Sequence, residues 1–211
     1  MTKISINIIL LSIFLLFSLN IKSQNFGGGC FAGIVASQIS GDDLSGFNKP
    51  GFNGGIFTNL KINEKLKLQL ELSYIQKGSR DNAYPDKGDY ESYLLRLNYV
   101  EMYLNFKFKL NKFFAFDAGP CIAYLFSHSE KYQYGELPLS VPFKKTDTGL
   151  TGGLHYIINN KLDAVFRISN SILPVREHKG GGTYRLNRGQ YNTVVSLSLH
   201  YNFKIKNKQN L

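Results

Sequence analysis

The chain has little cysteine and little proline, and it contains no tryptophan. Its 211 residues include 2 Cys, 6 Pro and no Trp, against 20 Gly, 13 Tyr and 16 Phe. Two cysteines cannot build a disulfide framework or a cysteine-based metal site. We expect Cys30 and Cys121 to be small buried apolar residues. An oxidising compartment would allow a bridge between them, which is not favoured because their predicted strands lie far apart. The aromatic-rich, proline-poor composition is typical of an all-β protein.

Long apolar runs are absent after the N-terminal segment. Residues 1–23 have the features of a secretory signal peptide: Lys3 precedes an apolar core at residues 8–19, and Ser23 is the small residue before the cut. A lipoprotein signal ending at Cys30 is the alternative, but its preceding glycines lack the aliphatic residue that begins such a motif. Every later apolar run is broken within a few residues by a polar one. A mature chain of this kind can enter a membrane as a closed barrel, because unpaired backbone groups cannot sit in lipid.

Motifs for nucleic-acid, phosphate and metal binding are also missing. The net charge is +10, but the positive residues are spread singly along the chain before a short basic tail at residues 204–211. We therefore expect no nucleic-acid partner. Gly180-Gly181-Gly182 lacks the strand–glycine–helix context of a phosphate-binding loop. The spacing of the four histidines does not resemble a zinc site. We predict no metal, no cofactor and no catalytic residue.

Alternation of apolar and polar residues is the strongest pattern in the chain, and it is clearest at residues 98–110. One face carries Val100, Met102, Leu104, Phe106, Phe108 and Leu110, and the other carries Tyr99, Glu101, Tyr103, Asn105, Lys107 and Lys109. Side chains alternate between the two sides of a strand, so this segment is predicted to be a two-faced strand. Its length exceeds the roughly five or six residues of an ordinary strand and suits a tilted strand that crosses a bilayer.

Seven further segments complete a set of eight predicted strands. The eight strands lie at residues 26–39, 51–61, 66–77, 94–110, 113–127, 149–158, 162–173 and 191–203. Short turns at 62–65, 111–112 and 159–161 alternate with long polar loops at 41–50, 78–93, 128–148 and 174–190. Short turns at one end and long loops at the other are typical of outer-membrane barrels. We predict an all-β fold, an eight-stranded antiparallel up-and-down transmembrane β-barrel over residues 24–203. The loops would lie outside the cell and residues 204–211 would form a short basic periplasmic tail.

Pro120 lies inside a strand, and we expect a bulge there.

The polar faces of the strands carry charges that such a barrel must hold in its lumen. They include Glu71, Glu101, Lys107, Asp117 and Arg167. Buried charges are costly unless they are paired, so we expect these to pair with one another and fill the lumen. Glu101 and Lys107 should find partners on neighbouring strands. His155 and His200 are also predicted to point inward. The apolar faces would contact lipid, with Tyr74, Tyr124, Tyr156, Tyr191 and Tyr201 near strand ends as interfacial girdles.

Two motifs resemble the PorT-like family of small outer-membrane β-barrel proteins of Gram-negative bacteria. Residues 97–101, Leu-Asn-Tyr-Val-Glu, resemble that family's motif of a Tyr, an aliphatic residue and a Glu before an apolar stretch. Residues 118–125, Ala-Gly-Pro-Cys-Ile-Ala-Tyr-Leu, are similar to its Gly-Pro strand. Met102-Tyr103 departs from the aliphatic-Pro pair frequent in the family, and eight residues follow the terminal aromatic Phe203. Over residues 25–203 the resemblance implies the barrel fold and the Gram-negative outer membrane, and it implies no reaction.

These observations predict a non-enzymatic outer-membrane protein with a structural or interaction role. Its external loops would be the contact surface and its lumen would be plugged. The expected partners are outer-membrane lipid and other envelope proteins, and the expected state is a monomer. Two alternatives remain open. One is an outer-membrane enzyme at the loop rim, where His128 and His178 lie near Ser127, Ser129 and Glu177. The other is a soluble lipocalin-like ligand carrier whose apolar faces point inward.

Overall fold

The computed structural model describes residues 26–42, 44, 46–88, 90–132, 135–136, 141–178 and 189–203. The predicted signal peptide at residues 1–23, the tail at 204–211 and the triple glycine at 180–182 lie outside the described residues. No helix within the described ranges is long and apolar enough to cross a membrane. The short helix η1 (Pro85–Lys87) lies in the loop between the third and fourth strands.

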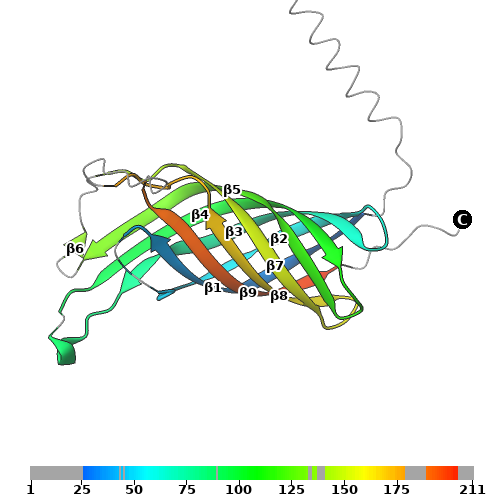
Figure 1. Cartoon of the computed structure of the whole chain (residues 1–211), viewed down its shortest axis with the longest axis horizontal. Helices are drawn as coiled ribbons and strands as arrows, with labels where there is room; N and C mark the ends of the chain where they lie inside the picture. The colour runs from blue at the N-terminus through cyan, green and yellow to red at the C-terminus, as the bar shows by residue number, and fades with distance from the viewer. Residues whose placement is uncertain are drawn as a thin grey trace, which may run out of the picture.

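The described residues form nine strands, of which eight are long. They are β1 (Phe26–Ser40), β2 (Lys49–Lys61), β3 (Leu66–Asp81), β4 (Tyr93–Lys109), β5 (Phe114–Tyr132), β6 (Gly135–Glu136), β7 (Thr146–Ile157), β8 (Leu162–Ser171) and β9 (Tyr191–Asn202). The long strands pair antiparallel in the order β4-β3-β2-β1-β9-β8-β7-β5, and pairing of β4 with β5 closes the ring (Figure 1). Two-residue β6 extends the sheet beside the end of β5. The predicted eight-stranded antiparallel barrel is confirmed.

The two ends of the barrel differ as the loop lengths predicted. The short turns and the C-terminal end of β9 lie at one end, here called the turn end, and the long connections lie at the other, the loop end (Figure 1). All three short turns contain an asparagine whose Oδ1 accepts hydrogen bonds from the backbone N–H groups two and three residues later. These asparagines are Asn63, Asn111 and Asn159. Such side-chain turns allow the chain to reverse direction in very few residues.

The two faces of each strand have the predicted orientation. On β4, the exposed fraction is 43% for Val100 and 40% for Leu104, while Glu101 is 1% exposed and Asn105 is fully buried. The outward-facing apolar belt continues around the barrel, including Ile34 on β1, Leu72 on β3 and many others. The lipocalin-like alternative is wrong, because it needs these apolar faces to point inward. A belt of this extent suits lipid contact rather than water.

Two local expectations are wrong. Pairing across Pro120 keeps one register with both neighbours, so no bulge lies there; the register shift between β4 and β5 lies instead at Asn98/Tyr99. Pro120 has no backbone N–H to donate, and the pairing of β5 with β4 is interrupted at Gly119 and Pro120 and resumes between Ala118 and Phe106. Cys30 is exposed, since it lies on the outward face of β1, whereas Cys121 is buried as expected. Both cysteines are free, on strands that do not pair.

Candidate functional site

Arg167 is the centre of a group of charged side chains in the lumen. Its Nη1 and Nη2 atoms lie 2.7 and 2.8 Å from the two carboxylate oxygens of Glu71, and Nη2 lies 2.6 Å from Asp117 Oδ2. The Tyr103 ring stacks near the guanidinium, with its centroid 5.1 Å from Cζ. Arg167 comes from β8 and Glu71 from β3, strands that stand four places apart in the ring of eight. The bidentate pair therefore reaches across the lumen, and the predicted pairing of Glu71, Asp117 and Arg167 is confirmed.

The same charge pattern continues towards the turn end. His155 Nε2 lies 2.6 Å from Asp117 Oδ2, and His155 Nδ1 lies 3.8 Å from Asp163 Oδ2. Lys107 Nζ lies 2.8 Å from the same Asp163 oxygen. Lys107 thus pairs with β8 rather than with a strand next to β4, so that part of our expectation is wrong. Acidic and basic groups alternate along this chain of contacts, which we call the central network.

A second polar group, the upper network, lies nearer the loop end and surrounds Lys77. Lys77 Nζ lies 3.1 Å from Glu101 Oε1 and 3.1 Å from Asp147 Oδ2. Ser171 Oγ and Asn192 Nδ2 donate to Asp147 over 2.7 and 2.8 Å. Glu101 pairs with neighbouring β3, as expected. Sequence reasoning missed Lys77 and Asp147, because it ended strand three at Lys77 and placed Asp147 in a loop. Lys77 already falls on the polar face of the predicted strand 66–77, and continuing the alternation of strand 149–158 two residues towards the N-terminus would have found Asp147.

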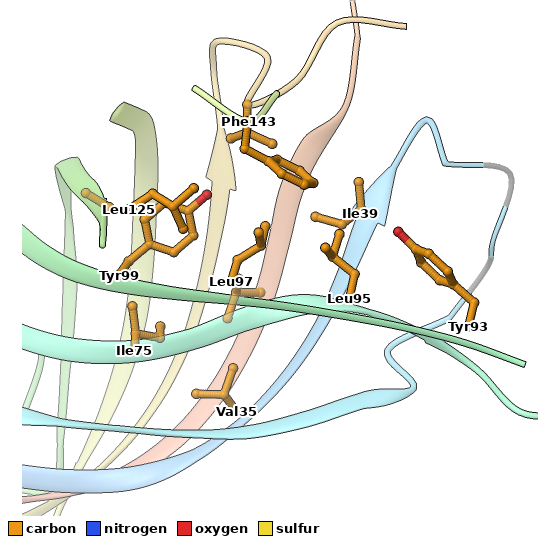
Figure 2. Packing of buried hydrophobic residues seen from close by; sticks show 12 residues of the cluster. Val35, Ile39, Ile75, Tyr93, Leu95, Leu97, Tyr99, Leu125 and Phe143 are labelled. Carbon is orange, nitrogen blue, oxygen red and sulfur yellow. The ribbon is translucent and has the colours of Figure 1, made fainter. Parts of the chain in front are cut away.

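A cluster of buried apolar side chains, here called the apolar cap, lies inside the barrel at the loop end (Figure 2). Its buried members are Val35, Ile39, Ile75, Tyr93, Leu95, Leu97, Tyr99, Ala123, Leu125, Phe143, Val175 and Val194. Most point inward from the strands, but Phe143 and Val175 come from the connections before β7 and after β8. Figure 2 shows Phe143 over the ends of the strands, facing Leu97 and Ile39. Apolar side chains packed at normal density leave little room for water.

Arg176 links the connections before β7 and after β8 to the rim of the barrel. It donates from Nη1 to Glu130 Oε2 over 2.8 Å and from Nε to Gln190 Oε1 over 2.9 Å, and its Cζ lies 4.2 Å from the centroid of the Phe143 ring. Tyr93, at the loop end of β4 beyond the apolar belt, donates to Glu130 Oε1 over 2.7 Å. Burial raises the pKa of Tyr93, and the hydrogen bond to Glu130 raises it further. The phenol therefore remains a donor throughout the physiological pH range.

Replacing Arg176 with alanine should loosen the rim without unfolding the barrel. The change leaves Glu130 with its Tyr93 bond but without its cation, at a cost of about 1–3 kcal/mol. Amide hydrogen exchange at Leu125 and Val175, whose N–H groups bond to Lys145 and Gln190, should accelerate by about tenfold or more.

The matched control for Arg176→Ala is Lys144→Ala, which removes a cation from the same rim. Lys144 and Glu177 lie 3.6 Å apart with exposed fractions of 44% and 69%. An exposed pair of this kind contributes about 0–1 kcal/mol, so exchange at the same two amides should hardly change. Equal acceleration in both variants would show that Arg176 does not anchor the rim.

A basic vestibule opens at the turn end, below the central network. Its volume is about 370 Å³, and its lining includes Lys65, Lys67, Lys107 and Lys109 with Glu64 and Asp163. The described part of the chain holds no group of three or more His, Cys, Asp or Glu side chains able to bind a metal ion. From the turn end to the loop end, the lumen contains the basic vestibule, the central and upper networks, and the apolar cap.

The histidines considered for catalysis are not brought together. His128 packs against Phe143, with ring centroids 5.8 Å apart, and among the described residues no hydrogen bond joins it to Ser127 or Ser129. His178 lines a different feature, a rim pocket of about 390 Å³ at the loop end. His155 and His200 point inward as predicted, with ring centroids 5.9 Å apart. No nucleophile–base arrangement is present among these described side chains.

Comparison with known proteins gives one family and a set of similar barrels. The family model described as "Outer membrane protein beta-barrel domain" matches residues 22–175. The attachment invasion locus protein Ail of Yersinia pestis is 13% identical, with 84% of this chain and 98% of that chain covered and a TM-score of 0.46. Neisserial surface protein A is 13% identical, covering 84% and 97% with a TM-score of 0.47. OprG of Pseudomonas aeruginosa is 12% identical, covering 85% and 95% with a TM-score of 0.39. No curated protein matches the sequence.

Proposed function

The chain belongs to the outer membrane protein β-barrel domain family and lies in the outer membrane of a Gram-negative cell, and we propose that it is a non-enzymatic interaction protein with a closed lumen. The observation that carries the proposal is the apolar cap. Leu95, Leu97 and Tyr99 on β4 are fully buried inside the barrel, where a conducting protein would expose polar side chains to water. The charged pairs of the upper network lie next to the cap, and those of the central network lie below them towards the turn end.

The loop end is proposed to be the external contact surface. Strands β3, β4 and β5 continue beyond the apolar belt, so the rim stands clear of the lipid (Figure 1). The rim pocket is lined by charged side chains that include Asp42, Glu91, Arg176, Glu177 and His178. Polar groups on loops that a rigid barrel holds in place are suited to recognition of another envelope component.

A closed lumen predicts that the protein does not conduct. The purified full chain, reconstituted into planar lipid bilayers, should give no discrete current steps above those of bare lipid. A general porin inserted under the same conditions provides the positive control. Regular steps of one size, obtained from protein whose folded band on an unboiled gel proves the barrel intact, would refute the closed lumen.

The contact surface is tested by placing a photoreactive amino acid at single positions in living cells. At His178, in the rim pocket, illumination should yield a protein adduct of reproducible mass. At Leu104, in the lipid-facing belt, the same probe should yield no such adduct. A rim probe that gives no protein adduct at any loop-end position would count against an interaction role.

A further inference from the structure

The outward face of β3, β4 and β5 changes in character step by step towards the loop end. Paired residues form rows across these three strands. In order, the rows are Leu72–Met102–Ile122, then Tyr74–Val100–Tyr124, then Gln76–Asn98–Ser127, then Gly78–Arg96–Ser129, and last Arg80–Leu94–Lys131. The surface thus passes from aliphatic through aromatic and neutral polar to cationic. This order matches the profile of one leaflet, from acyl chains through the interface to the headgroups.

The aromatic row fixes where the lipid boundary lies on this face. Tyr74 packs against Phe52 and Phe126, with ring centroids 5.3 and 5.9 Å away. Its hydroxyl donates to Asn98 Oδ1 over 2.9 Å and accepts from Gln76 Nε2 over 2.9 Å. Tyrosine with its ring in an aromatic patch and its hydroxyl in a polar row is typical of the membrane interface.

Cationic side chains gather directly beyond this boundary. A hollow of about 380 Å³ is lined by Lys49, Arg80, Arg96 and Lys131, with Asp81 as the acidic residue of its described lining. Among the described residues, neither Arg80 nor Arg96 lies within ion-pair distance of a carboxylate. Burial lowers the pKa of Lys49, and the nearby Arg96 and Arg80 lower it further, which is the effect of a local positive field.

The charge is local to this face of the barrel. On the opposite wall, the first row beyond the apolar belt is Gln38–Thr193–Asn170 across β1, β9 and β8, and the next row, at the level where the cations begin on β3 to β5, is Ser40–Tyr191 across β1 and β9. Neither row carries a charge, and Asn170 Nδ2 donates to Thr193 Oγ1 over 2.7 Å. A general preference for lysine and arginine near the membrane would have placed cations on both walls of the barrel. The cations on β3 to β5 therefore indicate a site.

We propose that this hollow binds the phosphate of a lipid headgroup in the outer leaflet. Arginine guanidiniums form paired, charge-assisted hydrogen bonds with phosphate oxygens, and two arginines and two lysines surround the hollow. Arg80 and Lys131 lie two strands apart, or about 10 Å, which their long side chains can bridge to one headgroup.

A lipid source is favoured over a soluble anion by the position of the hollow. A lipid whose acyl chains lie on the outward belt of Met102 and Ile122 carries its headgroup phosphate to the level of Arg96. The inference rests on the proposed orientation, with the loop end outside. The inference does not depend on whether the lumen conducts. The conductance measurement and the lipid-binding measurement can therefore fail independently.

The test uses the full chain purified in neutral detergent and two forms of one lipid. The probes are the phosphorylated glycolipid of a Gram-negative outer leaflet and the same glycolipid after enzymatic removal of its phosphates. The variant is Arg80→Gln with Arg96→Gln. The matched control is Lys65→Gln with Lys109→Gln, which removes the same charge from exposed positions at the turn end. Unboiled gels confirm that each variant is folded, and native mass spectrometry measures bound lipid.

Wild type and the turn-end control should bind the phosphorylated lipid at least about tenfold more tightly than the dephosphorylated lipid, and the arginine variant should lose this preference. Equal binding of the two lipids by wild type would overturn the proposal, as would an equal loss in the turn-end control. Inorganic phosphate that displaces the lipid at equal concentration would assign the hollow to a soluble anion. Tighter binding of a polyglutamate peptide than of lipid would assign it to an acidic protein. Either result overturns the lipid site.

Discussion

Arg167→Ala is expected to lower the free energy of unfolding by about 3–5 kcal/mol. Arg167 is buried between Glu71 and Asp117, and alanine leaves two carboxylates in the lumen without their cation. The contact between His155 and Asp117 does not replace the bidentate contact of Arg167 with Glu71. Urea titration of the barrel folded into phospholipid vesicles, followed by loss of the compact band on unboiled gels, measures this change.

The control for Arg167→Ala is Arg80→Ala, which removes the same side chain from an exposed position. It should change the free energy of unfolding by no more than about 0.5 kcal/mol. A triple variant, Arg167→Met with Glu71→Gln and Asp117→Asn, removes both signs of charge together. It should be less destabilised than Arg167→Ala, because no uncompensated charge is left buried. If Arg167→Ala cost no more than Arg80→Ala, the central network would not contribute to stability.

Leu104→Arg is expected to cost about 2–4 kcal/mol, the penalty for a cation at the middle of the bilayer. Leu104 lies at the centre of the outward stripe on β4, two residues from Met102 and two from Phe106. An arginine there must either enter lipid or bend far along the strand towards an interface. The same urea titration in vesicles measures the loss.

Ser127→Arg is the matched variant, since it adds the same charge to the outward face of the neighbouring strand. Ser127 pairs with Asn98 in the neutral polar row beyond the aromatic one, so the cost should be about 0–1 kcal/mol. The expected difference between the two positions follows from depth in the membrane. Equal costs at Leu104 and Ser127 would show that the stripe on β4 does not face lipid.

The sequence was sufficient for the strands and their two faces, because alternation with period 2 is a local property of the chain. Glu101 and Asn105 could be placed inside, and Val100 and Leu104 outside, from residues 98–110 alone. The eight segments and their short and long connections were enough to predict the closed ring. The short turns were also readable, since Asn63, Asn111 and Asn159 act within three residues of themselves.

Tertiary structure alone decided which groups meet, because contacts across a barrel depend on closure and on the stagger of every strand. Arg167 meets Glu71 from the opposite side of the ring, and Lys107 meets Asp163 rather than a neighbour. Only the folded chain brings Phe143 and Val175 into the lumen as part of the apolar cap. The basic hollow likewise forms where β2 to β5 end together, from residues that are scattered singly along the chain.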